Sequence, residues 1–348
     1  LTLRIFERNI RVVFLFDFLT QKLSQMNKLI FIAIIATFFA AQSCTDMSTA
    51  TGGGREGEVV VVLDKKFHET KAGDYIDTVL GAPVYGLPQY EPMFKVYMIP
   101  WNAFSNTFRA FRNIIKITIS SDVSKPKVTV KRADMQVVFH FKAPNESAFV
   151  ELLMNNEQQL LDLLNYTEKK YAKYKIRQGV NKNLRKYTLK NYNLHTTFPK
   201  GYEVRLDTSN FLWVSFETKD MSSGAFIYHF PYEDTNTFSK DYLLNKRDSL
   251  LELYVEGPLS ETRDTYMTTE YRFIPPKFTE LMVEDKYYTE TRGLWTVVND
   301  FMGGPFIQIS RLDKKRNRVV VFDGYVYNPG GNKRKFVRFL EAIGYMIK

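Results

Sequence analysis

The chain has 348 residues, of which 48 are lysine or arginine and 38 are aspartate or glutamate, so its formal net charge at pH 7 is +10. It contains a single cysteine, Cys44, which excludes an internal disulfide framework and any metal site held by several thiolates. The fold must therefore be stabilised by its hydrophobic core, and this length suffices for one large or two ordinary domains.

Residues 26–44, with the sequence MNKLIFIAIIATFFAAQSC, have the layout of a bacterial lipoprotein signal peptide. Lys28 gives a positive start, the apolar run 29–41 follows, and small Ser43 precedes Cys44. The apolar run is shorter than the roughly 20 residues that a membrane-spanning helix needs. We expect cleavage before Cys44, whose thiol then carries lipid, with residues 26–43 as the signal peptide. The alternative interpretation is a buried helix of the core.

Residues 1–25 contain no methionine, and Met26 opens a complete signal peptide. We expect this stretch to be a non-native upstream extension; the alternative is a genuine amphipathic leader. Residues 44–57 are rich in glycine and polar residues, which predicts a flexible tether. Cleavage before Cys44 removes five basic and two acidic residues, which lowers the net charge of +10 to +7.

A basic, lipid-anchored chain is expected in the bacterial cell envelope, at the outer membrane, with its periplasmic or surface face left open. Its basicity favours contact with anionic lipid or acidic glycans. The expected partners are the membrane, through lipidated Cys44, and an envelope protein or a glycan. Nucleic acid is not expected, because the compartment is wrong and no nucleic-acid motif is present.

The first folded unit is predicted over residues 58–190. It begins with a buried β-branched strand at 58–63, and a helix is expected at 71–80. Strands are predicted at 94–99 and 115–119 and as a pair at 128–131 and 136–142, with a helix at 101–113 between the first two. The longest helix is predicted over 148–175, and a basic stretch rich in tyrosine follows it to residue 192.

The second unit is predicted over residues 191–348. Successive antiparallel strands are expected at 202–206, 212–217 and 225–230, and a helix at 239–255. Further strands are expected at 268–274, 286–290, 294–299, 306–311 and 318–327, and an amphipathic helix at 332–347. The fold class is therefore α+β, with mainly antiparallel sheets and packed helices in two abutting α/β sandwich units.

The sequence indicates no familiar catalytic or metal site. None of the histidines has metal-ligand spacing, and no nucleophile elbow, phosphate-binding loop or dinucleotide fingerprint is present. We therefore expect no metal and no cofactor, and a non-enzymatic role is favoured although an enzyme stays possible. The catalytic residues, if there are any, are not identified.

Two segments are candidates for binding a ligand or a partner. In the first, a tight turn at 303–305 is predicted to present residues of the preceding strand and loop, namely Trp295, Asp300, Phe301 and Met302. In the second, aromatic and acidic side chains that can stack on sugars and bond their hydroxyls gather at Tyr228, His229, Tyr232 and Asp234. The alternative interpretation is that both segments fill the core or form ordinary turns.

The chain resembles a family of uncharacterised Bacteroidetes lipoproteins that is defined only as a domain of unknown function. The resemblance rests on the box ending at Cys44 and on three segments, GYEVRLDTSNFLWVSFET (201–218), YHFPYED (228–234) and RGLWTVVNDFMGGPF (292–306). It implies an envelope lipoprotein and supplies no activity. The favoured hypothesis is a non-enzymatic binding or structural module of the envelope. The alternative is a hydrolase of glycans or lipids that uses scattered carboxylates such as Asp300 and Asp234.

Overall fold

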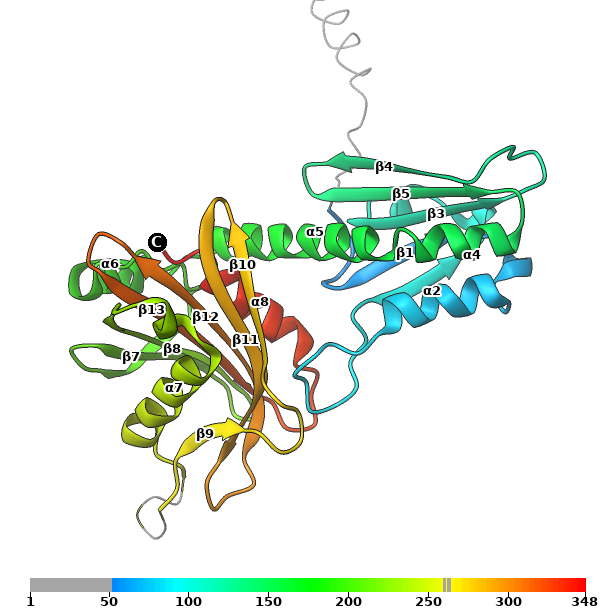
Figure 1. Cartoon of the computed structure of the whole chain (residues 1–348). Coiled ribbons are helices and arrows are strands. Elements are labelled where there is room, and N and C mark those ends of the chain that lie inside the picture. The colour runs from blue at the N-terminus through cyan, green and yellow to red at the C-terminus, as the bar shows by residue number, and fades with distance from the viewer. Residues whose placement is uncertain (1–51, 259–260, 262–263) are drawn as a thin grey trace, which may run out of the picture. The chain divides into compact units, whose positions relative to one another are not determined.

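The computed structural model describes residues 52–348 apart from 259–260 and 262–263 (Figure 1). The upstream extension, the signal peptide and Cys44 therefore lie outside the described residues. In the part of the chain that is described, no helix is long and apolar enough to cross a bilayer. The described residues contain two β-sheets, one of five strands and one of eight.

The five-stranded sheet is formed by the first part of the chain. Its strands are β1 (Glu58–Val62), β2 (Lys95–Ile99), β3 (Asn113–Ile119), β4 (Lys127–Ala133) and β5 (Gln136–Ala143), in the spatial order β2-β1-β3-β5-β4. Only β4 and β5, the predicted pair, run antiparallel; the other neighbours are parallel. This sheet is therefore mixed. Its parallel strands are joined by long crossover connections, whereas β4 and β5 are joined by a short turn.

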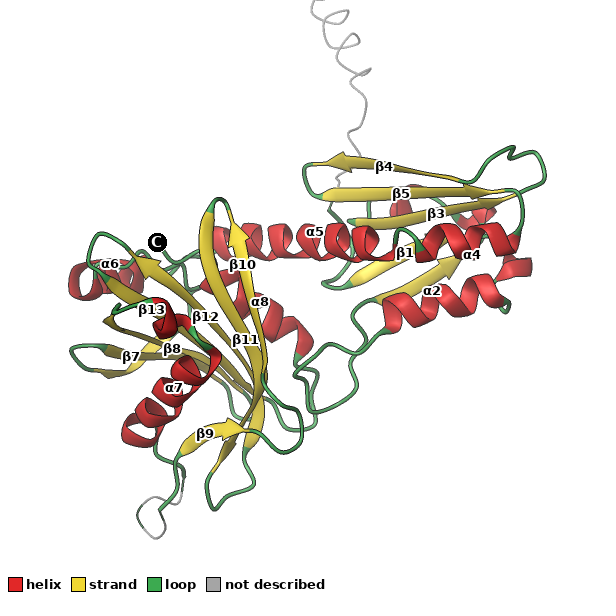
Figure 2. Cartoon of the chain, viewed as in Figure 1, coloured by secondary structure: helices red, strands yellow, loops and turns green. Residues whose placement is uncertain are grey.

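Helices cover one face of this sheet (Figure 2): α2 (Lys71–Gly81), α4 (Glu146–Met154) and α5 (Glu157–Gln178). The long helix predicted at 148–175 is thus two helices, since Asn156 leaves the helical conformation with φ −120° and ψ 7°. The helix predicted at 101–113 is reduced to η3 (Trp101–Ala103) and α3 (Asn106–Arg109). A further short turn, η2 (Lys65–Phe67), follows β1.

The eight-stranded sheet is formed by the rest of the chain, and every described pairing in it is antiparallel. Its main order is β10-β11-β12-β13-β8-β7-β6, with β9 paired to β11. The strands are β6 (Glu203–Asp207), β7 (Phe211–Glu217), β8 (Ser222–Pro231), β9 (Met267–Glu270), β10 (Lys277–Val283), β11 (Lys286–Val297), β12 (Gly303–Asp313) and β13 (Arg318–Tyr327). The strands predicted at 286–290 and 294–299 are both part of β11, and β10 was not predicted.

Both faces of this sheet are buried, because alternate residues of its central strands enter two separate cores. Helices α6 (Lys182–Tyr192) and α8 (Arg334–Gly344) contribute to the core on one face. Helix α7 (Lys240–Tyr254) and the turn η4 (Thr235–Phe238) contribute to the core on the other. Mixed helices and strands in two sheets confirm the predicted α+β class.

The start of the described chain is bound to the folded part. The backbone nitrogen of Gly53 donates to the carbonyl of Ala110 at 2.7 Å, and Gly53 forms a bridge with Phe111. The side chain of Arg112 donates to the carbonyls of residues 52–55. Residues 52–57, which the sequence assigns to the tether, are therefore attached to the five-stranded sheet by hydrogen bonds.

Candidate functional site

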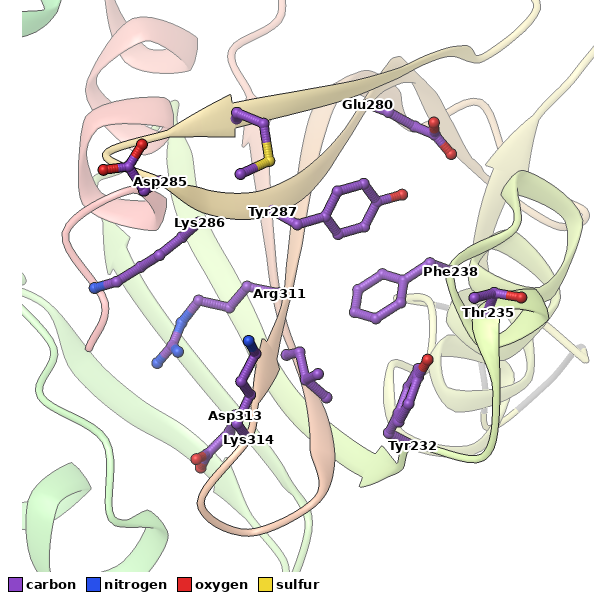
Figure 3. A pocket seen from close by; sticks show the side chains of 12 residues that line it. Tyr232, Thr235, Phe238, Glu280, Asp285, Lys286, Tyr287, Arg311, Asp313 and Lys314 are labelled. Atoms are coloured by element: carbon purple, nitrogen blue, oxygen red, sulfur yellow. The ribbon is translucent and has the colours of Figure 1, made fainter.

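A cavity of about 790 Å³ opens at one end of the eight-stranded sheet (Figure 3). Pairing between β11 and β12 stops at Tyr288 and Arg311, so the first two residues of β11 separate from the last two residues of β12. The cavity occupies this opening, between the β10–β11 hairpin, the end of β12 and η4. Its lining comprises Tyr232, Thr235, Phe238, Glu280, Met282, Asp285, Lys286, Tyr287, Arg311, Leu312, Asp313 and Lys314. Its size lies within the range of small-molecule sites.

One side of the cavity is a wall of three aromatic rings. Phe238 is central: its ring centroid lies 5.3 Å from that of Tyr287, edge to face, and 5.9 Å from that of Tyr232. The backbone around Phe238 is fixed by a capping box, in which Asp234 accepts from the Asn236 backbone nitrogen at 2.8 Å. These contacts hold the aromatic wall in place without a ligand.

The opposite side of the cavity carries charges of both signs, with Asp285 and Asp313 among three basic residues. Lys286, Arg311 and Lys314 lie there, away from the aromatic rings (Figure 3). Among the described residues Arg311 forms no ion pair, and its buried Nε atom has no hydrogen-bond partner. Burial lowers the pKa of Arg311, although Tyr288 and Asp313 act against this shift. A buried Nε donor without a partner is costly, and an anion that reached it would stabilise the side chain.

Two of the acidic residues of the cavity, Asp313 and Glu280, interact with neighbouring side chains. Asp313 accepts from Arg318 Nε at 3.0 Å and from Arg316 at 3.2 Å. Burial alone would raise the pKa of Asp313, but these two hydrogen bonds hold it below its ordinary value. Burial and a hydrogen bond with Glu280 raise the pKa of Tyr287 to about 12. Asp313 is therefore ionised and Tyr287 protonated at neutral pH.

The segment predicted at 228–234 contributes to this site in part. Tyr232 lines the cavity, and Asp234 fixes η4 as its N-cap. Tyr228 is buried beneath the sheet, where its hydroxyl accepts from Gln308 at 3.0 Å. His229 is half-buried beside Tyr192, and burial, aided by the charge of Arg318, lowers its pKa.

The segment predicted at 295–302 lies elsewhere. Trp295 is buried and donates to the carbonyl of Val326 at 3.2 Å. Asp300 accepts from the backbone nitrogens of Phe301 and Met302 and so stabilises its own turn. The side chain of Phe301 is fully exposed, whereas Met302 packs partly against the core.

The tight turn predicted at 303–305 is not where the chain reverses. Residues 303–305 begin β12, and the reversal falls on 298–302, where Asn299 has φ 59°. Glycine is needed at Gly304 because a Cβ there would lie 2.1 Å from the Val326 carbonyl oxygen. The two glycines thus allow a close approach of neighbouring strands instead of forming a turn.

The structure does not bring Asp234 and Asp300 together. Asp234 follows the end of β8 that pairs with Arg318, at the end of the sheet where β12 finishes with Asp313, whereas Asp300 precedes Gly303 at the start of β12. An extended strand rises about 3.3 Å per residue, so the length of β12 separates them by roughly 30 Å. Paired carboxylates of glycosidases lie about 5–9.5 Å apart.

The charged side of the cavity and two of its aromatic rings were not predicted. Arg311 left a signal in the sequence, because it continues the alternation of Ile307 and Ile309 and so places a charge where an apolar residue is expected. Phe238 and Tyr287 left none, since nothing local distinguishes them from other aromatic residues of the core.

The two family models that match the chain are both domains of unknown function. Residues 181–345 match a domain of unknown function, DUF4837, and residues 52–177 match a second one, DUF8532. No curated protein matches the chain. A solved structure of a mutant of the protein Mog1 is similar to 44% of this chain and 84% of its own, at 10% identity. Its TM-score of 0.25 is too low to establish a shared fold.

Proposed function

We propose that this protein is a lipid-anchored lipoprotein of the bacterial cell envelope that binds an acidic glycan without converting it. The cavity at the end of β12 is the binding site, and lipidated Cys44 is the anchor. The proposal extends the resemblance to Bacteroidetes lipoproteins, whose members have no assigned activity.

The proposal rests on the missing hydrogen-bond partner of Arg311 Nε. This buried atom has none among the described residues, while Lys286 and Lys314 add positive charge beside it. An arginine fork matches a carboxylate or a phosphate in geometry, and charge-assisted hydrogen bonds are about twice as strong as neutral ones. An anionic group on the ligand would supply the partner that Arg311 Nε lacks.

The opposite wall suits a sugar ring. The rings of Tyr232, Phe238 and Tyr287 offer flat apolar surfaces, and Thr235 and Glu280 at the margin can bond to hydroxyl groups. A sugar that carries a carboxylate or a phosphate would use both walls at once. A neutral apolar ligand would leave Arg311 Nε unsatisfied.

The hydrolase alternative receives less support from the site. The two carboxylates named for it, Asp234 and Asp300, lie at opposite ends of β12. Within the cavity, Asp313 is ion-paired with Arg318 and has a lowered pKa, which suits a fixed charge and not a general acid. Binding is therefore the better explanation of the geometry.

Calorimetric titration of the chain with an oligogalacturonide tests the sugar-binding part. We expect binding to the acidic oligosaccharide and none to a galactose oligomer that lacks carboxylates. The change Arg311→Gln should weaken binding about 10- to 100-fold, because it removes a charged hydrogen bond of ~1.5–3 kcal/mol. Arg185→Gln, at an exposed position of α6, removes the same charge away from the cavity and should have no effect.

Two results would overturn this part: equal binding of the neutral and acidic oligosaccharides, or equal loss in the two arginine variants. The anchor is tested separately by detergent phase partitioning of the protein made in a bacterial host. Cys44→Ser should move the protein from the detergent phase to the aqueous phase. Absence of such a shift would rule out lipidation at this residue.

A further inference from the structure

One face of the five-stranded sheet carries none of the helices α2, α4 and α5, and only the short η3 segment packs on part of it, through Trp101 and Phe104. Its exposed part is formed by β3, β5 and β4. Strand register sets which residues share it: Lys116 lies beside His140, and His140 beside Thr129. In the next row Thr118 lies beside Lys142, and Lys142 beside Lys127. The third row ends in Lys131, opposite Val138. We name this surface the basic face; its residues are Lys116, Thr118, Lys127, Thr129, Lys131, Val138, His140 and Lys142.

The basic face contains no acidic residue. Lys127 and Lys142 are directly opposite each other on neighbouring strands, an arrangement that destabilises a sheet because like charges face at short range. The pKa of His140 on this face is lowered. Burial is the largest cause, and the positive charges of the four neighbouring lysines, Lys142, Lys116, Lys127 and Lys131, add to it. The face thus holds positive charge that its own residues do not neutralise.

Aromatic residues border the basic face on its β3 side. Trp101 lies 5.9 Å from the His140 ring and donates to the Ile117 carbonyl at 3.0 Å. Lys116 Nζ lies 4.9 Å from the ring centroid of Phe104, and the Arg109 guanidinium lies 5.5 Å from the same ring. Half-exposed aromatic rings next to lysine and arginine are typical of surfaces that contact a membrane interface.

The chain enters the folded part close to this face. Gly53 is hydrogen-bonded to Ala110, the residue after Arg109, and a Cβ on Gly52 would lie 3.0 Å from Met135, in the turn between β4 and β5. Seven residues lie between Cys44 and Gly52, and the eight steps from one Cα atom to the next span at most about 28 Å. With lipid on Cys44, a membrane surface is within reach of the basic face.

We propose that the basic face docks on an anionic lipid surface, with its lysines contacting lipid phosphates and Trp101 and Phe104 at the interface. The choice of a membrane as the occupant rests on the proposed envelope anchor; the charge and geometry of the face do not depend on it or on the cavity. Docking would orient the protein on the membrane that holds its lipid.

Flotation of the full chain carrying Cys44→Ser tests the proposal without the anchor. The probes are vesicles of phosphatidylcholine alone and of phosphatidylcholine mixed with phosphatidylglycerol. We expect flotation only with the anionic vesicles, and release as sodium chloride is raised. The double change Lys127→Gln and Lys131→Gln should lower partitioning about 25-fold, because each lysine near such a surface contributes about fivefold.

A matched variant separates the basic face from net charge. Lys182→Gln together with Lys186→Gln removes two exposed lysines from α6 and should leave flotation unchanged. Both variants change exposed side chains, and their thermal unfolding verifies that they fold. Equal loss in the two double variants, or no flotation of the parent chain with anionic vesicles, would overturn the proposal.

Competition identifies the source of the phosphate. Displacement of the anionic vesicles by inorganic phosphate, at the ionic strength of a chloride control, would mean a site for free phosphate and would overturn docking on lipid. Displacement by a single-stranded DNA oligonucleotide at lower concentration than the lipid would assign the face to a nucleic acid. Arg311→Gln should float like the parent, so failure of glycan binding and failure of docking are distinguishable.

Discussion

Arg247 and Asp323 form an ion pair in the core of the eight-stranded sheet, with Nε 2.7 Å from Oδ2 and both side chains fully buried. Arg247 also donates to Thr269 at 2.8 Å, and its guanidinium lies 4.0 Å from the ring centroid of Phe306. A buried pair of this kind gains little net stability, because desolvation of both charges offsets their attraction. Its chief consequence is that folding depends on the protonation of Asp323.

We predict that the ionisation of buried Asp323 makes the protein less stable as the pH rises from 4 to 7. Burial raises the pKa of Asp323 to about 6, above the ordinary 3.8, although the charge of Arg247 acts against the shift. A folded-state pKa above the unfolded value adds stability below pH 4, and this contribution is lost as the pH rises through 6. The loss amounts to ~3 kcal/mol, at 1.4 kcal/mol per pH unit.

Urea unfolding of the parent and of Asp323→Asn at several pH values measures this contribution. The difference in free energy of unfolding, parent minus variant, should fall by ~3 kcal/mol from pH 4 to pH 7. Asp122→Asn, a change at an exposed turn, serves as the matched control. Parallel curves for the parent and Asp323→Asn would contradict the prediction.

Glu341 should have the opposite effect on stability at low pH. It is buried and accepts from Arg292 at 3.0 Å and from Lys169 at 2.6 Å. Burial alone would raise the pKa of Glu341, but the two cations outweigh it and hold the pKa at about 2. A pKa below the unfolded value of 4.5 adds stability above pH 4.5, which is lost as the pH falls toward 2.

Glu341→Gln should therefore cost ~3 kcal/mol at pH 7, because Arg292 and Lys169 lose their shared carboxylate and Arg292 keeps only Glu290. The cost should shrink by ~3 kcal/mol on acidification to pH 2, where the parent also becomes protonated. Circular dichroism of urea unfolding at pH 7 and at low pH measures both values. A penalty that is the same at both pH values would argue against ionic pairing of Glu341.

Sequence reasoning succeeded where the signal is local. The alternation of Ile115, Ile117 and Ile119 with polar residues predicted β3. The helix predicted at 239–255 is α7, whose N-cap Ser239 accepts from the Tyr242 backbone nitrogen. It failed for α6, whose residues are mostly polar: of its side chains only Leu184, Thr188 and Tyr192 are buried, and distant segments bury them. Strand β10 was missed because, at the sheet edge, several of its residues are exposed.

The candidate site was predictable only in part, because only some of its residues stand in a segment with a distinctive local sequence. Tyr232 and Asp234 stand in a distinctive local segment, and both contribute to the cavity or its support. The cavity itself depends on where β11 and β12 separate, which is set by long-range pairing and by η4. Arg311 could have been suspected from its position in an alternating strand, but its lack of a partner requires the structure.

The variant Gly304→Ala tests whether the glycines of segment 303–305 are needed for the close approach of neighbouring strands. A Cβ at this position would lie 2.1 Å from the Val326 carbonyl oxygen and 3.0 Å from Trp295 Nε1. Gly304→Ala should therefore destabilise the protein by ~1–3 kcal/mol or more, because β12 and its neighbours must move apart. Chemical unfolding measures the change.

Gly179→Ala is the matched control for this experiment, since a Cβ there would meet no atom within 4 Å. It should change the free energy of unfolding by less than about 0.5 kcal/mol. If Gly304→Ala is equally mild, then the two glycines are not required for close approach and a turn function would have to be reconsidered.

Arg112 should control whether the start of the described chain stays attached to the sheet. Its Nη1 atom donates to the carbonyls of Gly52, Gly53 and Gly54, its Nη2 atom donates to that of Arg55, and its Nε atom lies 3.0 Å from Glu168. Only arginine offers five donors in this fixed arrangement, so no other side chain can replace all these bonds.

Arg112→Met should release residues 52–57 and, because Glu168 is left buried without its cation, cost ~3–5 kcal/mol of stability. Release exposes the bond after Arg55 to trypsin, so that cleavage there, identified by mass spectrometry under native conditions, should precede cleavage elsewhere in the chain. Arg132→Met changes an exposed arginine of β4 and should leave the cleavage rate at Arg55 unchanged. If Arg55 is cut at the same rate in the parent and in Arg112→Met, then the backbone bond from Gly53 to Ala110 suffices to hold the segment, and the carbonyl contacts of Arg112 are dispensable.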